Sequence, residues 1–242
     1  QYFLNSRMCA NWGYERLAKR HREISLEEMR DTEELIDRIL YLDGHPNLQG
    51  IWQVLNTAAW DIEDHGASLG VPAGHGVVEG GAIPYQPSAL EKRKENLANR
   101  AKLDPETRCY LPGVPRITYM PYPFQIVQGT TKIHVAFSFA NAARTIHLDE
   151  VEEPPADTAM GHSLGRWEGD TLVVESSGFH GQSWLDRAGN FHSSALRLQE
   201  RFTPITADAI QYEVTIDDSA VFTRPWKISM PLYRRLEPNA QL

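Results

Sequence analysis

The chain has 242 residues, of which 41% are hydrophobic and 23% are charged, and its formal net charge is −8 at pH 7. This composition is typical of a globular protein with one large domain or two modest ones. The acidic balance argues against a nucleic-acid partner, and no apolar run approaches the roughly 18–20 residues of a transmembrane segment.

Residues 1–50 are predicted to form a short helical hairpin, because their apolar residues recur at helical spacing. Ser25, followed three residues later by Glu28, has the pattern of a capping box and predicts that a second helix begins there. Gly44 and Pro46 predict the end of this helix. Two helices cannot bury their apolar faces alone, so we expect another subunit, further helices or the rest of the chain to cover them.

Residues 51–242 have the alternating pattern of short strands, separated by loops rich in glycine and proline. The expected strands are 50–55, 124–128, 132–139, 143–148, 165–168, 171–176, 196–202, 210–217 and 226–235. One helix is expected near residues 87–101. The sequence therefore predicts an α+β chain, in which a helical segment over 1–50 precedes a mostly antiparallel β-barrel or β-sandwich domain over 51–242.

Two stretches of the first part, QYFLNSRMCANWGYERLA and EEMRDTEELIDRILYLDGHPNLQ, resemble the end of the first helix and the second helix of a bacterioferritin. In that family a Glu-Met-x-His segment supplies an iron-binding Glu and His and a haem-binding Met. The resemblance implies Glu28 as an iron ligand and Met29 as a haem ligand, whereas Asp31 stands in place of the His. The other iron ligands come from helices without a counterpart here, which disfavours a haem or iron centre.

The second part resembles a group of uncharacterised, usually exported bacterial proteins. The resemblance is carried by stretches such as CYLPGVPRITYMPYPFQIVQ and MGHSLGRWEGDTLVVESSGF. It implies a β-rich domain and a periplasmic or secreted location, although the chain contains no signal peptide. We also expect further residues before Gln1 and after Leu242 in the natural protein. A natural fusion and an artificial junction near residue 50 both remain open.

Catalysis is one hypothesis for the β-rich part. Ser163 lies in a Gly-x-Ser-x-Gly pattern, which in hydrolases places a nucleophile on a strand-to-helix turn. The residues that follow read as strands, so a turn that enters a strand is the alternative. His180 and Asp186 could form a general acid–base pair.

Metal binding is another hypothesis. His162, His180, Asp186 and His192 are expected in loops or at strand ends, where imidazole and carboxylate groups could bind Zn, Cu or Fe. Their spacing matches no compact metal motif, and hydrogen-bonded or surface histidines are the alternative.

Ligand binding is the third hypothesis for this part. Trp167 and Trp184 could line an apolar pocket at a barrel mouth, and Arg144 and Arg166 could hold an anionic group. Aromatic residues at alternating strand positions also serve as simple core.

The sequence contains no complete catalytic motif and leaves open whether the protein is an enzyme. The first hypothesis is an exported domain that binds a small molecule or acts as an accessory subunit with other protein subunits. The alternatives are a metal-assisted hydrolase that uses the loop histidines and a haem or iron protein of bacterioferritin type.

Overall fold

The computed structural model describes residues 2–42, 44–68, 70–152 and 154–237. In the helical part, it does not describe the side chains of residues 3, 33–35 and 37–41. The chain divides into two compact units, Gln1–His45 and Pro46–Leu242. The boundary lies at His45, whereas the sequence pattern placed it near residue 50.

The first unit is the predicted helical hairpin, formed by α1 (Tyr2–Asn11) and α2 (Glu15–Tyr41). Cys9 and Ala18 are buried between the two helices. The break between them falls at Gly13, which has a left-handed φ of 80° that glycine adopts without a steric penalty. The prediction that the second helix begins at Ser25 was wrong: Ser25 lies inside α2, because the helix starts earlier, directly after the Gly13 turn.

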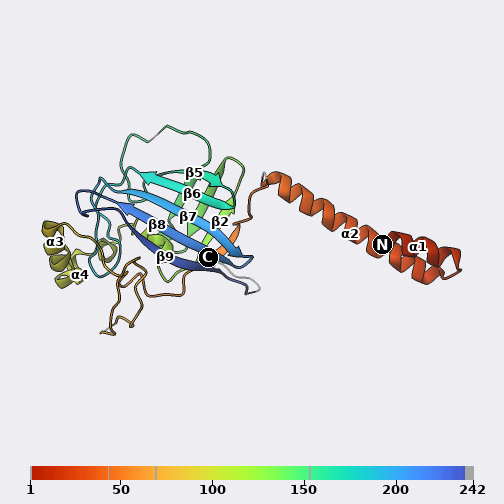
Figure 1. The fold of residues 1–242 in the computed structure, drawn as a ribbon, viewed down its shortest axis with the longest axis horizontal. Coiled ribbons are helices and arrows are strands. Elements are labelled where there is room, and N and C mark those ends of the chain that lie inside the picture. The colour runs from red at the N-terminus through yellow and green to blue at the C-terminus, as the bar shows by residue number, and fades with distance from the viewer. Residues whose placement is uncertain (1, 43, 69, 153, 238–242) are drawn as a thin grey trace. The chain divides into compact units, whose positions relative to one another are not determined.

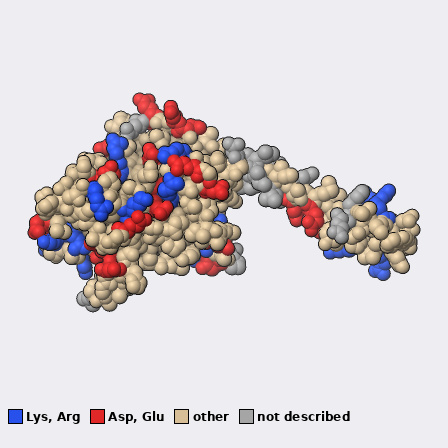
Figure 2. Space-filling view, viewed as in Figure 1, with Lys and Arg blue, Asp and Glu red and all other residues tan. Residues whose placement is uncertain are grey.

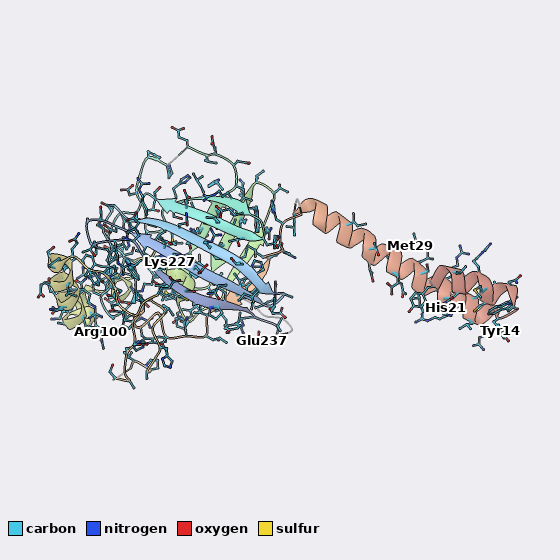
Figure 3. The ribbon with its side chains drawn as sticks, in the orientation of Figure 1. Tyr14, His21, Met29, Arg100, Lys227 and Glu237 are labelled. Atoms are coloured by element: carbon cyan, nitrogen blue, oxygen red, sulfur yellow. The ribbon has the colours of Figure 1, made fainter. Side chains whose placement is uncertain are left out.

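The described surface of α2 carries several exposed apolar side chains. Leu26 and Ile36 are about half exposed, and Met29 is 57% exposed. Figure 3 shows the Met29 side chain projecting away from the helix axis. Among the described residues, neither α2 nor any other helix combines the length and the apolar character that crossing a bilayer requires.

The second unit is a closed barrel of nine described strands in sequence order (Figure 1). The strands are β1 (Gly50–Gln53), β2 (Phe124–Gln128), β3 (Lys132–Phe137), β4 (Ala143–His147), β5 (His162–Glu168), β6 (Thr171–Ser177), β7 (Arg197–Thr206), β8 (Ala209–Asp217) and β9 (Trp226–Arg234). Neighbouring strands are antiparallel except for β4 and β5. The pairing of Trp52 with Arg234 joins β1 to β9 and closes the barrel. The predicted α+β fold with a mostly antiparallel barrel is thus confirmed.

Alternation of side chains explains why these segments form a barrel. Along β8 the inward residues Ile210, Tyr212, Val214 and Ile216 are buried, and the residues between them are more exposed. This period of two directs one face of each strand into a common core. The β5–β6 hairpin turns within two residues, and Gly169 there has a φ of 60° that suits a tight hairpin turn.

Three long connections, residues 54–123, 178–196 and 218–225, meet at one end of the barrel, called the loop end below. Tyr85 bridges to Phe222, and the Arg187 N–H donates to the Ala59 carbonyl over 3.1 Å. This end also carries α3 (Pro87–Ala98), which Figure 1 shows beside the barrel. The remaining short helices are α4 (Arg100–Leu103), η1 (Pro105–Arg108), η2 (Arg116–Tyr119) and η3 (Phe139–Asn141).

The segment before β1 closes the opposite end of the barrel. Leu48 is 1% exposed and belongs to the barrel core, although it lies within the stretch that resembles a bacterioferritin. Its N–H donates to the Gln128 side chain over 2.8 Å, and its carbonyl accepts from the Trp52 indole over 2.9 Å. These contacts fix residues 46–49 to the barrel rather than to the helices.

We expect Leu48→Ala to lower the free energy of barrel unfolding by about 2–3 kcal/mol, because it leaves a cavity beneath Trp52. Urea denaturation followed by tryptophan fluorescence measures this change. The matched control is Leu55→Ala, since Leu55 lies two residues beyond the end of β1 and is 69% exposed. Equal stability of the two variants would show that residues 46–49 do not contribute to the barrel.

Candidate functional site

The loop end of the barrel contains a pocket of about 460 Å³, a size in the usual range for small-molecule sites. Its walls come from three segments that are far apart in the sequence: residues 60–71, residues 97–107 and residues 187–188. The lining residues are Trp60, Asp61, His65, Gly66, Ser68, Gly70, Val71, Leu97, Arg100, Ala101, Asp104, Glu106, Thr107, Arg187 and Ala188.

One wall of the pocket is a narrow arm formed by residues 65–68 and 70–74. His65 and Gly74 exchange two backbone hydrogen bonds of 3.1 and 3.0 Å, and Ser68 pairs with Val71 nearer the tip. The His65 Nδ1 atom lies 2.9 Å from the Glu63 carbonyl oxygen, which can only accept, so Nδ1 carries the proton. His65 Nε2 is buried and has no partner among the described residues.

The floor of the pocket carries carboxylates that are already paired. Asp104 receives two hydrogen bonds of 2.9 Å from Arg116, which is 1% exposed. Glu106 accepts from Arg116 over 2.6 Å and from Arg187 over 2.6 and 3.0 Å. Such bidentate, largely buried pairs fix the geometry of the floor.

Arginine groups define the rest of the pocket. The Arg187 guanidinium lies 5.2 Å from the centre of the Trp60 ring, in a cation–π contact. Asp61 forms an ion pair of 3.7 Å with Arg93. Arg100, by contrast, has no hydrogen bond or ion pair with a side chain among the residues that the structure describes. Figure 3 labels Arg100 at the loop end, near α3.

A buried carboxyl group, Asp186, connects the loop that carries Arg187 and Ala188 to the segment that carries Asp61. Asp186 is 0% exposed and accepts backbone hydrogen bonds from Ile62 over 3.0 Å and from Ala188 over 2.9 Å. Asn190 donates to it from both its backbone and its side chain. Burial, reinforced by the negative charge of Asp61, raises the pKa of Asp186 to about 7. Asp186 therefore organises the pocket from beneath and is not open to a ligand.

The four residues of the metal hypothesis are engaged separately. Asp186 is held as described above, and the His180 Nδ1 accepts from the Gln182 N–H over 3.1 Å. The His162 ring on β5 lies 5.7 Å from the His147 ring on β4, tilted by 30°. Within the described ranges, no three His, Cys, Asp or Glu side chains are grouped so that they could hold one metal ion. The structure thus does not bring these four residues together, nor does it pair His180 with Asp186 as an acid–base couple.

His192, the fourth of them, instead forms a pair that sequence reasoning missed. Its Nε2 lies 2.8 Å from Ser183 Oγ, and its Nδ1 lies 2.9 Å from the Ser193 carbonyl, which fixes the proton on Nδ1. Burial lowers the pKa of His192 and favours the neutral ring, as a general base requires. Both side chains are 2% exposed, so a substrate cannot reach Ser183 in this conformation. The pair holds the 183–193 loop closed.

Ser163 lies inside the barrel, within β5, and not on a strand-to-helix turn. Its Oγ accepts from Arg144 Nε over 2.9 Å and contacts Ser176 Oγ at 3.1 Å. Arg144 also forms a buried ion pair with Glu200, and Tyr212 donates to the same carboxylate over 2.7 Å. The environment of Ser163 is therefore that of a buried structural network and differs from a nucleophile elbow.

The residues predicted to bind a ligand are distributed over different parts of the barrel. Arg144 is used by Glu200 in the interior, where the remaining cavity is only about 10 Å³. Arg166 is on the outer surface and pairs with Glu168 and Glu175. Trp167 packs partly against the core, and Trp184 is buried near the loop end. The structure does not bring these four residues into one pocket.

The outer surface of the barrel carries charges of both signs. Figure 2 shows interspersed blue and red side chains over the visible face, without a broad area of either sign. Glu168 forms ion pairs of 2.9 Å with both Arg166 and Arg201.

The residues of the iron and haem hypothesis lie on the described surface of the helical unit. Glu28 and Met29 are both exposed, and the backbone carbonyl of Glu28 accepts from the Thr32 hydroxyl over 2.7 Å. Asp31 is exposed on the same helix. No described side chain of this unit closes an iron site around them.

Comparison with known proteins addresses the N-terminal part of the chain. Residues 1–65 match the family model of the ferritin-like domain. Bacterioferritins from Brucella melitensis and Mycobacterium leprae are 51% and 57% identical over 51 residues, which are 21% of this chain and 32% of each relative. A bacterioferritin from Rhodobacter capsulatus is 49% identical over 49 residues, 20% of this chain and 30% of its own.

The predicted resemblance of the N-terminal segment to bacterioferritins is thus confirmed. The chain spans about a third of the length of the curated relatives that it matches. The resemblance of residues 51–242 to exported bacterial proteins stays a prediction.

Proposed function

We propose that the barrel unit is a small-molecule binding domain, and that its site is the pocket at the loop end. The observation that carries the proposal is the combination of volume and lining. A space of about 460 Å³ is bounded by apolar groups from Val71, Leu97 and Ala101, and by polar groups held in fixed positions. Ligand sites combine apolar surface with oriented polar atoms, and this lining offers both, with charged and hydroxyl side chains beside the apolar groups.

The packed barrel interior supports this location. A barrel that binds its ligand internally needs an open centre, and here the interior cavity of about 10 Å³ has room for little more than one water molecule. The loop end offers the alternative, because long loops on a rigid barrel are free to shape a site. Three such loops converge there, and the buried Asp186 joins two of them, 54–123 and 178–196.

The ion pairs in the floor of the pocket also support ligand binding, because they hold the lining side chains in fixed positions. Arg116 and Arg187 hold Glu106 from two sides, and Arg187 also contacts the Trp60 ring. These contacts restrict the rotamers of the lining residues before a ligand arrives, which lowers the entropy cost of binding. An extracytoplasmic location belongs to the same proposal and rests on the resemblance of residues 51–242 to exported proteins.

We expect 8-anilinonaphthalene-1-sulfonate, a fluorescent aromatic anion, to bind the folded protein at a single site. Ala101→Trp should weaken this binding at least about tenfold, because the new ring would occupy the pocket between α4 and the arm. A fluorescence titration of the folded full chain measures the affinity and the stoichiometry.

The matched control is Ala98→Trp, since Ala98 is exposed at the end of α3 and does not line the pocket. This variant should bind the dye as the wild type does. Failure of the dye to bind, or equal binding by Ala101→Trp and the wild type, would contradict a ligand site at the loop end.

A further inference from the structure

We infer that the ligand of this pocket is an organic anion, and that Arg100 receives its anionic group. The inference rests on the proposed function and adds the chemical class of the ligand: a carboxylate, sulfonate or phosphate group attached to an apolar or aromatic body.

The acidic residues of the pocket disfavour a cationic ligand, because they are already paired. Each acidic residue in the lining already has a basic partner: Asp61 has Arg93, which also pairs with Glu63, Asp104 has Arg116, and Glu106 has both Arg116 and Arg187. The basic partners are used in the same contacts. A cationic ligand would have to displace an arginine from a largely buried ion pair, which is costly.

Arg100 lines the same pocket from α4, and among the described residues its guanidinium has neither a hydrogen bond nor an ion pair with another side chain. It is thus the positive charge of the lining that remains for a ligand. A guanidinium group offers paired N–H donors whose spacing matches the oxygen atoms of a carboxylate or phosphate.

Beside Arg100, the pocket presents the side chains of Val71, Leu97 and Ala101, with the Trp60 ring on the same lining. An ion with no apolar part would leave these surfaces in contact with water. An anion with an apolar or aromatic body would bury them, at roughly 25 cal/mol per Å² of apolar area.

Two dyes with the same aromatic frame test this inference. 8-Anilinonaphthalene-1-sulfonate carries a sulfonate group, and N-phenyl-1-naphthylamine is its neutral counterpart. We expect Arg100→Gln to weaken binding of the sulfonate dye by about three- to tenfold. The affinity of the same variant for the neutral dye should stay within about twofold of the wild-type value. Lys102→Gln is the matched control, because Lys102 is an exposed cation on the same helix that does not line the pocket.

The outcomes separate the inference from the proposal beneath it. If Ala101→Trp weakens both dyes and Arg100→Gln weakens neither, the pocket binds ligands but Arg100 does not select anions, and the inference is overturned. If Lys102→Gln lowers the affinity for the sulfonate dye as much as Arg100→Gln does, the effect comes from the overall surface charge, and the inference also fails. If Ala101→Trp changes neither dye, the binding site itself is elsewhere.

Discussion

Glu200→Ala is expected to lower the free energy of barrel unfolding by about 3–5 kcal/mol. The substitution would leave the Arg144 guanidinium without its carboxylate in the barrel interior, where both side chains are almost completely buried. It would also remove the acceptor of the Tyr212 hydroxyl. Polar groups that lose their partner in the barrel interior cannot form hydrogen bonds with water instead, so the cost of their desolvation is not compensated. Denaturant unfolding at pH 7 measures the loss.

Two further variants show whether burial is the cause. Glu168→Ala removes a carboxylate that pairs with Arg166 and Arg201 on the outer surface, and it should unfold at the same denaturant concentration as the wild type. The double variant Arg144→Met, Glu200→Leu replaces the buried pair by apolar groups of similar size and should recover most of the stability. A wild-type-like Glu200→Ala protein would contradict a structural role for this ion pair.

The buried Asp186 predicts an unusual dependence of stability on pH. Its pKa is raised to about 7 in the folded protein, whereas an unfolded chain releases this proton near its ordinary value, about 3.9. Between these values the native state binds more protons than the unfolded state, so the contribution of Asp186 falls as pH rises from 4 to 7. A difference of about three pH units corresponds to roughly 4 kcal/mol.

Asp186→Asn isolates this contribution, because asparagine has nearly the same shape and no titration. We expect the stability of the wild type relative to this variant to decrease by about 4 kcal/mol between pH 4 and pH 7. Urea denaturation at several pH values gives the difference curve and removes the contribution of all other groups. A flat or rising difference curve would show that the four N–H donors around Asp186 keep its pKa low, contrary to this prediction.

The strand positions could be predicted from the sequence because a half-buried strand alternates regardless of its neighbours. Segments such as 124–128 and 171–176 show this alternation or a continuous apolar run, and turn residues bound them. Sequence alone did not separate a barrel from a sandwich, since both fold classes use the same alternation. The difference is made by the pairing of β1 with β9, which depends on residues at opposite ends of the unit.

The site was missed because its residues share no local pattern. Trp60 and Arg100 lie 40 residues apart in the connection 54–123 and Arg187 lies in the connection 178–196, so their approach depends on how these segments fold back on the barrel. One signal was available in the run from Trp60 to His65, which places an aromatic residue, three acids and a histidine in a Gly/Pro-rich connection. Conversely, the sequence predicted site roles for Arg144 and Asp186, but both side chains are buried and belong to internal hydrogen-bond networks.

The closure of the barrel by its first and last strands has a consequence for biosynthesis. During translation β1 emerges first, and its partner β9 emerges after every other strand of the unit. Until then β1 and β8 each present an unpaired edge that could recruit strands from neighbouring nascent chains. The barrel can therefore close only after β9 has been synthesised, and the pairing of Trp52 with Arg234 removes both unpaired edges.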